Sequence, residues 1–228
     1  MLLEIAVFNT YDALNAANAG ANRLEICSNY EAGGITCTQT DLEKIRTLTH
    51  IPLFAIVRPR GGNFIYNKEE FLQMQQTILL CKKLEYNGVV LGILNEDDTI
   101  DVERTKQLVE IANPLPVTFH RAFDKVPNFE IALDAVIKTG CKRILTSGGK
   151  STAYEGKETL KHLIKKASSN IIIIPGGGIR NHHLLELVQQ TNATEFHSAA
   201  ITNGNNICAK EIELMLQTLS KQKSPQPW

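Results

Sequence analysis

The spacing of short apolar runs is the feature of this chain that most limits its fold. Eight runs of four to seven residues recur along 228 residues, and segments with a helical spacing of apolar side chains separate them. Such runs are typical of strands buried on both faces, as in a parallel sheet whose connections are helices. The runs lie at residues 2–7, 23–27, 52–57, 88–94, 115–119, 143–146, 171–174 and 195–199.

The segments between the runs carry helix signals. Apolar residues at positions 129, 132, 133, 136 and 137 share one helical face, and Gly140 follows as a helix stop. Thr38 and Asn67 are expected to begin two further helices, because Asp41 and Glu70 stand three residues later. A last helix is expected to end near residue 219.

Eight strand–helix units predict an α/β fold of one kind, the (β/α)8 TIM barrel. This fold takes about 250 residues, with about 200 as a lower bound. A doubly wound open sheet is the rival architecture, but eight regular units without a second domain favour the barrel. We expect one barrel domain over residues 1–219 and a short tail over residues 220–228.

Composition excludes several classes of protein. Lysine plus arginine and aspartate plus glutamate are equal at 24 each, so no basic excess favours nucleic acid or an anionic membrane as partner. No apolar run approaches 18 residues, and the first residues lack the basic start of a signal peptide. The five cysteines are far apart and contain no C-x-x-C, which indicates reduced thiols in a cytoplasmic protein.

Alternation along the strands places ionisable side chains inside the predicted barrel. In each strand the apolar set should face the helices, so the residues between them point inward. This rule places Glu4 and Glu25 inside from the first two strands and Arg58 inside at the end of the third. His120 and His197 follow from the fifth and the eighth strands.

Two interpretations of these inward groups remain open. Because buried charges need partners, they could form a structural ion network that joins Glu4 or Glu25 to Arg58. Barrel interiors are normally filled by branched apolar residues, however, so a site at the carboxyl ends of the strands is favoured. There the two glutamates and two histidines would act as general acids and bases or hold a divalent metal. Gly92 would leave room for a ligand or a neighbouring chain.

Two glycine-rich loops are candidates for anion binding. Gly176, Gly177 and Gly178 follow the seventh strand, where free N–H groups and a helix start can hold phosphate or carboxylate. The same glycines could instead form only a tight turn. Asn181 is expected to cap the next helix, and the T-S-G-G segment around Ser147 is a weaker candidate of the same kind.

Arginines near the strand ends also favour an anionic ligand. Arg58 and Arg60 lie in R-P-R-G-G, where two guanidinium groups can bind an oxyanion through paired donors. Arg121 and Asp124 follow the fifth strand and either contact the same ligand or form a surface pair. These residues predict a small anionic or phosphorylated ligand. The protein could turn it over by acid–base or metal-assisted chemistry, or bind it without turnover.

Five motifs in these positions resemble the CutC family of copper homeostasis proteins. They are R-P-R-G-G at 58–62, T-F-H-R-A-F-D at 118–124, L-T-S-G at 145–148, P-G-G-G-I at 175–179 and E-F-H at 195–197. The resemblance spans about residues 3–200. It implies a cytoplasmic TIM barrel, often a homo-oligomer, and it adds copper, which spacing alone does not indicate.

The copper that the resemblance implies would be Cu(I), which prefers thiolate ligands. Cys27 stands where the family has the cysteine of R-I-E-L-C, and its position combines a strand end with an inward direction. Ala6 stands where some members carry another cysteine. Cys27, with Cys37 as second ligand, is therefore the predicted Cu(I) site.

Overall fold

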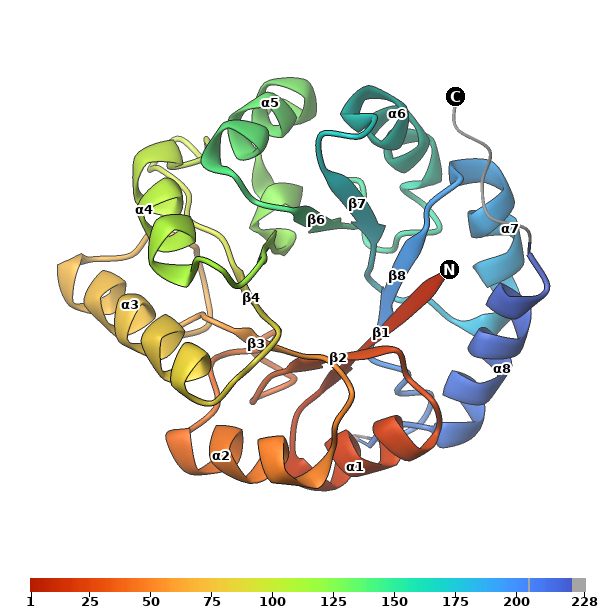
Figure 1. The fold of residues 1–228 in the computed structure, drawn as a ribbon. Helices are drawn as coiled ribbons and strands as arrows, with labels where there is room; N and C mark the ends of the chain where they lie inside the picture. Colours follow the sequence, from red (N-terminus) through yellow and green to blue (C-terminus); the bar gives the residue numbers. More distant parts are fainter. Residues whose placement is uncertain (205, 223–228) are drawn as a thin grey trace.

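Eight parallel strands form one sheet that closes almost completely into a barrel (Figure 1). The structure, a computed structural model, describes residues 1–204 and 206–222. Neighbouring strands pair in the order β7-β6-β5-β4-β3-β2-β1-β8. Every strand overlaps an apolar run, so the predicted TIM barrel is confirmed. The strands are β1 (Leu2–Val7), β2 (Arg23–Ile26), β3 (Leu53–Ile56), β4 (Gly88–Leu91), β5 (Val117–Phe119), β6 (Arg143–Thr146), β7 (Ile172–Pro175) and β8 (Glu195–Ser198).

The seam between β7 and β8 is where the barrel closes least tightly. Parallel ladders of two or more residue pairs join all the remaining pairs of neighbouring strands. Across this seam the residues that the structure describes form an isolated parallel bridge between Gly176 and His197. Side chains inside the barrel therefore matter for holding the two edges together.

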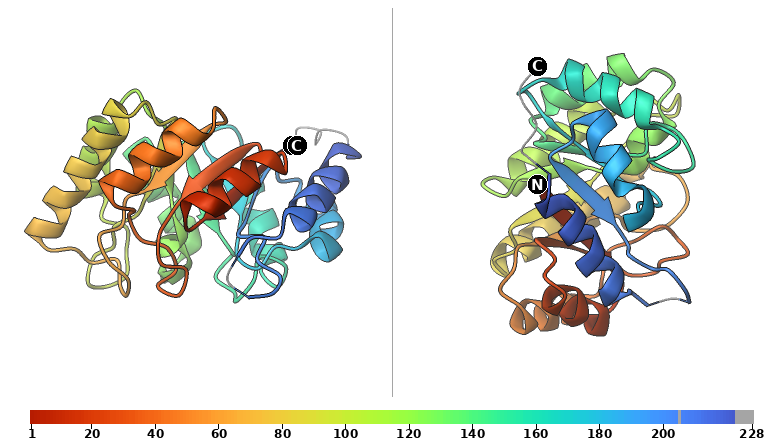
Figure 2. Two further views of the ribbon diagram at one scale, coloured as in Figure 1. Left: turned by 90° about the horizontal axis from the view of Figure 1, so that it is seen from below. Right: turned by 90° about the vertical axis from the view of Figure 1, so that its right-hand side faces the viewer.

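A helix follows each strand and packs outside the sheet, as two further views also show (Figure 2). A short 3-10 helix, η1 (Arg121–Lys125), comes between β5 and its helix. The helices are α1 (Thr10–Asn18), α2 (Gln39–Leu48), α3 (Lys68–Lys83), α4 (Val102–Ala112), α5 (Phe129–Thr139), α6 (Lys157–Ala167), α7 (Asn181–Thr191) and α8 (Ala209–Ser220).

The predicted helix ends are mostly correct. Thr38 accepts a hydrogen bond from the Asp41 N–H at the start of α2, and Asn67 begins α3 with a full capping box. Gly140 ends α5 with a left-handed φ of 86°, a conformation that glycine adopts without strain. The prediction for Asn181 is wrong, because Arg180 occupies the N-cap position of α7 and Asn181 is its first residue.

The alternation of side chains divides the apolar residues into two regions. Leu3, Ile5 and Phe196 are fully buried in the larger region, between the sheet and the helices. A small inner cluster inside the barrel contains Cys27, Phe54, Ile56 and Val90, with Phe8 packed against it. Polar side chains such as Glu4 and Glu25 occupy other interior positions, as the alternation predicted.

A buried ion network fills the amino-terminal half of the barrel. Arg23 forms ion pairs with Glu4 and, at 2.7 Å, with Glu195, and Arg143 Nε contacts the same Glu195 carboxylate at 2.9 Å. The Phe54 ring lies 4.7 Å from the Arg23 guanidinium and 5.6 Å from that of Arg143. The network joins β1, β2, β6 and β8, so it crosses the seam.

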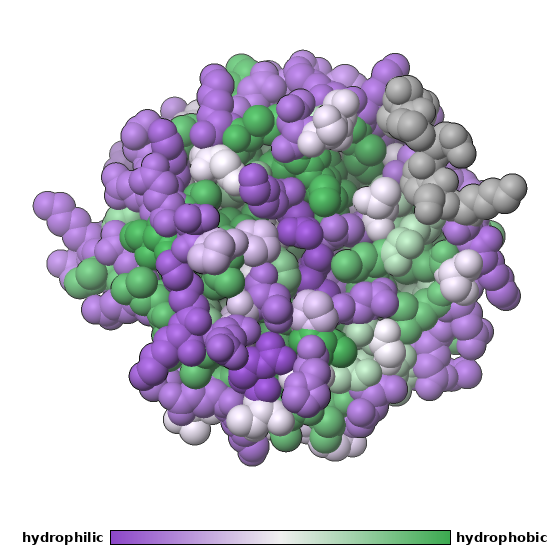
Figure 3. All heavy atoms as spheres, in the orientation of Figure 1, coloured by the Kyte–Doolittle hydropathy of each residue, from purple (hydrophilic) through white to green (hydrophobic). Residues whose placement is uncertain are grey.

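The remaining surface features are simple. No helix among residues 1–204 and 206–222 is long and apolar enough to cross a membrane. Hydrophilic side chains separate the apolar patches on the face shown in Figure 3. The last helix ends at Ser220, one residue beyond the predicted domain boundary, and residues 223–228 of the predicted tail lie outside the described residues.

Candidate active site

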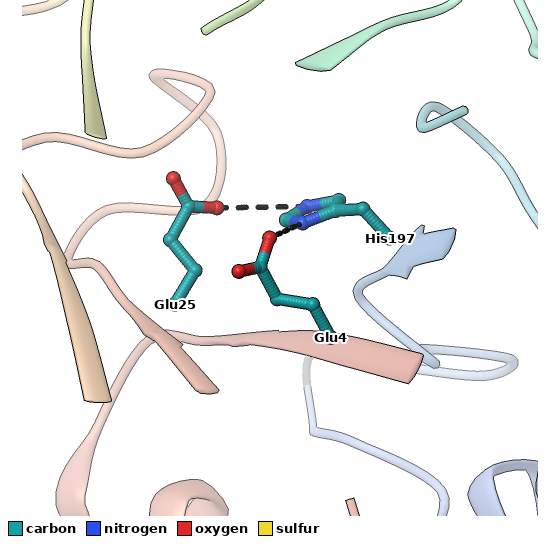
Figure 4. A group of neighbouring side chains, drawn as sticks. All are labelled: Glu4, Glu25 and His197. Atoms are coloured by element: carbon teal, nitrogen blue, oxygen red, sulfur yellow. Dashed lines mark hydrogen bonds and ion pairs between the residues drawn. The ribbon is translucent and has the colours of Figure 1, made fainter. Parts of the chain in front are cut away.

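Three side chains from β1, β2 and β8 meet inside the barrel (Figure 4). Strand pairing sets Glu4 beside His197 and sets Glu25 beside Ala6, two residues further along β1. One nitrogen of the His197 ring, Nδ1, lies 2.8 Å from Oε1 of Glu4. Its Nε2 lies 3.5 Å from Oε2 of Glu25. The imidazole thus stands between two carboxylates.

Glu4 is held as a carboxylate. Burial raises the pKa of its side chain, but the hydrogen bond to His197 and the charge of Arg23 outweigh burial and lower the pKa to about 2. The negative charge of Glu4 is therefore neutralised from inside the protein. Its position between Arg23 and His197 lets it orient the imidazole and stabilise its protonated form.

Glu25 has the opposite character. Burial, supported by the charge of Glu4, raises the pKa of Glu25 to about 7, against the smaller lowering effect of His197. Burial lowers the pKa of His197, but the hydrogen bond to Glu4 and the charges of both glutamates raise it overall. Glu25 and His197 can therefore exchange a proton near neutral pH, which suits a general acid–base pair.

His120 lies at the end of β5 as a neutral imidazole. Its Nδ1 accepts a hydrogen bond of 3.2 Å from the Ala122 N–H, which assigns the ring proton to Nε2. Burial, together with the charge of Arg58, lowers the pKa of His120 to about 3. Among the described residues, nothing accepts a hydrogen bond from Nε2. The space left by Gly92 is used by this ring, since a Cβ there would lie 2.6 Å from Nδ1.

Arg58 is buried at the end of β3, but it does not pair with Glu4 or Glu25. The prediction that Arg58 pairs with a glutamate in the ion network is wrong, because Arg23 pairs with Glu4 instead. The Arg58 guanidinium donates to the carbonyl oxygens of Ala32, Gly34 and Gly62 at 2.8, 2.9 and 3.0 Å. Its Nε has no partner among the described residues. Arg58 therefore fixes two loops while keeping its charge beside the mouth of the barrel.

Four of these groups, Glu25, His197, His120 and Arg58, line one cavity of about 230 Å³, whereas Glu4 is not part of its lining. It includes eight of the residues predicted from sequence to form the site, and apolar side chains fill the gaps between them. The predicted residues are Glu25, Cys27, Arg58, His120, Arg121, Gly177, Gly178 and His197. Residues that the sequence analysis did not single out for the site also line it: Ala6, Phe8, Tyr30, Gly33, Ile56, Phe64, Leu145, Arg180 and Ala199.

The structure places Arg60 away from the cavity. Its Nε lies 2.6 Å from Glu70, and its other nitrogens donate to the carbonyl oxygens of Gly61, Asn63 and Ile65. The side chain thus braces its own loop against the start of α3. Sequence proximity to Arg58 did not show this, because neighbouring residues in a loop can point in opposite directions.

Arg121, Asp124 and Ser147 form a connected group at the rim. Arg121 Nε lies 2.7 Å from Asp124 and Nη2 donates to Ser147 Oγ at 2.9 Å. The Asp124 carboxylate also accepts from the N–H groups of Ser147 and Gly149, so it organises the loop after β6. Arg121 alone of the three lines the cavity, and its side chain is 42% exposed. Asp124 and Ser147 therefore orient the arginine.

The glycines of the loop after β7 have two different roles. A Cβ on Gly176 would lie 2.3 Å from Leu145, so this glycine allows the barrel to close. Gly177 and Gly178 line the cavity, and no described residue accepts a hydrogen bond from their N–H groups. The start of α7 itself is already occupied, because Glu211 accepts from the Asn181 N–H at 2.6 Å. Anion binding would thus use the loop rather than the helix end.

The two predicted copper ligands lie in different surroundings. Cys27 lines the cavity, where burial and the charge of Glu25 raise the pKa of its thiol well above the ordinary value. Cys37 lies in the apolar region outside the barrel and lines a surface groove with Leu42 and Leu80. Burial raises the pKa of Cys37 to about 12.

The residues best placed to bind a metal ion are not the two predicted cysteines. Among residues 1–204 and 206–222, ligand atoms of Glu4, Glu25 and His197 all lie within 4.8 Å of one another. Carboxylate oxygen and imidazole nitrogen are donors for divalent cations rather than for soft Cu(I).

Several residues of the interior escaped the sequence analysis. Arg23 has the same parity as Glu25, which would have placed it inside the barrel. Arg180 follows the glycine loop, and it lines the cavity while donating to the Ile179 carbonyl oxygen at 2.7 Å. Tyr30 follows β2 with no motif to mark it. Each carried a positional signal but no distinctive residue pattern.

The fold and this polar cavity define a (β/α)8 barrel with a candidate catalytic site at the carboxyl ends of its strands. Residues 1–202 match the CutC family, and the chain belongs to it. A human copper homeostasis protein cutC homolog is 42% identical over 87% of this chain and 73% of its own length. A CutC family protein of Xylella fastidiosa is 40% identical over 87% and 74%. The crystal structure of CutC from Streptococcus agalactiae superposes with a TM-score of 0.84 at 32% identity, covering 89% of this chain and all of that one.

Proposed function

We propose that this member of the CutC family is an enzyme that performs acid–base chemistry on a small anionic molecule in the barrel cavity. The observation that carries the proposal is the pair formed by Glu25 and His197. The two side chains lie 3.5 Å apart and both line the 230 Å³ cavity, where burial raises the pKa of Glu25 to about 7. Such pairs are typical of catalytic sites.

The surroundings of the pair favour an anionic ligand. Arg121 and the N–H groups of Gly177 and Gly178 provide donors on one side of the cavity. Glu4 does not repel such a ligand, since Arg23 and His197 neutralise it. An anionic group would bind at these donors while the reactive part of the molecule reaches Glu25.

Three side chains have distinct parts in proton transfer, and two of them, Glu25 and His197, line the cavity. Glu25 takes a proton from the substrate as general base or returns one as general acid. His197 can relay that proton through Nε2, and Glu4 stabilises the imidazolium through the 2.8 Å contact to Nδ1. The arrangement needs no further protein group to hold the proton between steps.

A thermal-unfolding screen with inorganic phosphate, sugar phosphates and small carboxylates tests the binding part of this proposal. A ligand at 100 times its Kd stabilises the folded state by about 2.7 kcal/mol, which raises the Tm. We expect Arg121→Ala to reduce that rise. Arg46→Ala, which removes an arginine of α2 outside the cavity, should leave it unchanged. If no compound shifts the wild-type Tm, with or without a divalent metal, the proposal fails.

A role in copper homeostasis is the second candidate, supported by the names of the relatives. Cys27 lines the cavity, whereas Cys37 belongs to the apolar region between the sheet and the helices. Cu(I) would have Cys27 as its sole thiolate among the cavity-lining residues. Anaerobic Cu(I) titration should therefore weaken in Cys27→Ser and not in Cys37→Ser. Equal affinity in Cys27→Ser would leave this role without a ligand in the cavity.

Cellular location and assembly are also proposals. The family resemblance leads us to propose a cytoplasmic homo-oligomer. Light scattering on the purified chain measures its mass directly. A particle of 25.3 kDa, the mass of one chain, would contradict the oligomer.

A further inference from the structure

His120 presents one hydrogen-bond donor that the protein itself does not use. The ring is 4% exposed and lines the cavity, and Nδ1 is occupied by the Ala122 N–H. Nε2 therefore carries the proton and has no acceptor among the described residues. An unpaired buried donor destabilises the folded protein. A donor kept at that cost inside a ligand cavity indicates that a ligand oxygen accepts from it.

The surroundings of His120 favour an oxygen that gains negative charge. The Arg58 guanidinium is near enough to lower the pKa of the imidazole, so it would also stabilise an oxyanion held there. Phe64 contacts both groups, with its ring centroid 4.8 Å from the Arg58 guanidinium and 4.9 Å from the His120 ring. This aromatic contact holds the donor in place and limits the access of water to it.

A base lies in the same cavity. Glu25 comes from β2 and His120 from the end of β5, and both line the 230 Å³ space. Glu25 makes no hydrogen bond to a basic side chain other than its 3.5 Å contact with His197 among the described residues. A small molecule in the cavity can therefore touch a carboxylate and a neutral imidazole donor at once.

We propose that the reaction is proton abstraction from a carbon next to a carbonyl group, with Glu25 as base and His120 Nε2–H as hydrogen-bond donor to the carbonyl oxygen. This inference rests on the proposed function and names its substrate class, a small carbonyl compound that also carries a phosphate or carboxylate. That anionic group would bind at Arg121 and at the N–H groups of Gly177 and Gly178.

The proposed step is balanced without any further reagent. The Glu25 carboxylate takes the proton, and the electron pair of the C–H bond forms a carbon–carbon double bond. The π electrons of the carbonyl group move to its oxygen, which becomes an enolate oxygen hydrogen-bonded to His120. Return of the proton to the same carbon restores the substrate. Where that carbon also carries a hydroxyl group, the hydroxyl proton passes to the enolate oxygen and a carbonyl group forms at that carbon. The electrons of the carbon–carbon double bond then take the proton from Glu25 at the former carbonyl carbon, which gives an isomer.

A neutral imidazole is the better donor for this purpose. It stabilises the enolate by a hydrogen bond without transferring a proton early, and its own protonation cannot compete at neutral pH. Removal of one such donor typically lowers the rate by about 10²–10³-fold. His120→Asn keeps an acceptor for the Ala122 N–H, but its amide N–H groups are too short to reach the position of Nε2. His120→Gln keeps a donor of similar reach, so the two variants form a matched pair.

Deuterium uptake measured by proton NMR tests the inference. The full chain is incubated in D₂O with dihydroxyacetone phosphate, glyceraldehyde 3-phosphate, pyruvate and 2-oxoglutarate, each against an enzyme-free control. We expect enzyme-dependent exchange of the proton next to the carbonyl group in at least one probe. His120→Asn should lower that rate about 10²–10³-fold, and His120→Gln should lower it less than tenfold. Thermal unfolding confirms that both variants are folded.

The outcomes separate this inference from the proposed function. No exchange in any probe overturns the inference, and so does exchange that is unchanged in folded His120→Asn. If the same probes still raise the wild-type Tm, anion binding stands and only the carbonyl chemistry falls. If they neither exchange nor raise the Tm, and the wider screen also fails, the proposed function falls with it.

Discussion

At the scale of single residues, the site depends on two glutamates whose pKa values are shifted in opposite directions by their surroundings. Glu4 has Arg23 and His197 as partners, and its pKa falls to about 2. Glu25 is buried beside Glu4 and forms no ion pair with an arginine among the described residues, and burial raises its pKa to about 7. The same side chain thus serves as a fixed charge in one place and as a titrating group in the other.

This difference predicts how stability depends on pH. Glu25 binds its proton more tightly in the folded state than in the unfolded chain, where its pKa is about 4.5. Its contribution is fully present below pH 4.5 and is lost as the pH rises through about 7. Glu4 acts in the opposite sense, and its contribution is lost as the pH falls from 4.5 towards 2.

We therefore expect the free energy of unfolding, measured in urea, to fall between pH 5 and pH 8 by an amount on the order of 1–3 kcal/mol. Glu25→Gln should flatten that part of the profile, because glutamine does not titrate. Glu4→Gln, the matched control, should change the profile below pH 4.5. An equally steep fall above pH 5 in Glu25→Gln would contradict the assignment.

At the scale of elements, glycines on β4 and just beyond it make room for side chains from neighbouring strands. A Cβ on Gly88 would lie 2.2 Å from the Phe54 ring of β3, and a Cβ on Gly92 would lie 2.6 Å from His120. Phe54 in turn contacts the guanidinium groups of Arg23 and Arg143. The side chains at these two glycine positions are thus kept small so that groups from the neighbouring strands β3 and β5 fit.

Gly88→Ala should destabilise the protein by about 1–3 kcal/mol, because the new methyl group displaces the Phe54 ring in a packed interior. Phe54→Leu should remove much of that penalty, since leucine lacks the ring carbons in contact. A double-mutant cycle in urea measures the coupling between the two sites. Strictly additive effects would mean that Gly88 is required for another reason.

At the scale of the whole molecule, the interior ion network compensates for a sheet that is incompletely hydrogen-bonded at one seam. Arg143 of β6 and Glu195 of β8 lie on opposite sides of β7, and Arg23 continues the chain of ion pairs to Glu4. Figure 1 shows β7 and β8 side by side, where described residues form an isolated bridge. Charge pairs inside the barrel therefore tie together strands that few backbone bonds join.

Arg23→Met should lower the free energy of unfolding by about 3–5 kcal/mol, because it leaves Glu4 and Glu195 buried without their shared cation. Lys210→Met removes one partner of an exposed pair with Glu213 and should cost less than about 1 kcal/mol. Urea unfolding of both variants gives the comparison. Similar small losses would show that the network does not support closure of the barrel.

Much of this architecture could be predicted from sequence. The eight apolar runs matched the eight strands, and alternation placed Glu4, Glu25, His120 and His197 inside the barrel. Both signals are local, since the direction of a side chain in a strand depends on its position along that strand. The same rule would have placed Arg23 inside, but an arginine on a strand without a motif drew no attention.

The partners of these residues could not be predicted in this way. Only the tertiary structure showed that Arg23 neutralises Glu4, that Arg58 binds loop carbonyl oxygens, and that Cys37 lies outside the barrel. Alternation gives the direction of a side chain but not the height at which residues from distant strands meet, which depends on the register and closure of the sheet. The sequence by itself therefore determined which groups enter the barrel, and the tertiary structure decided which of them pair and which remain free for a ligand.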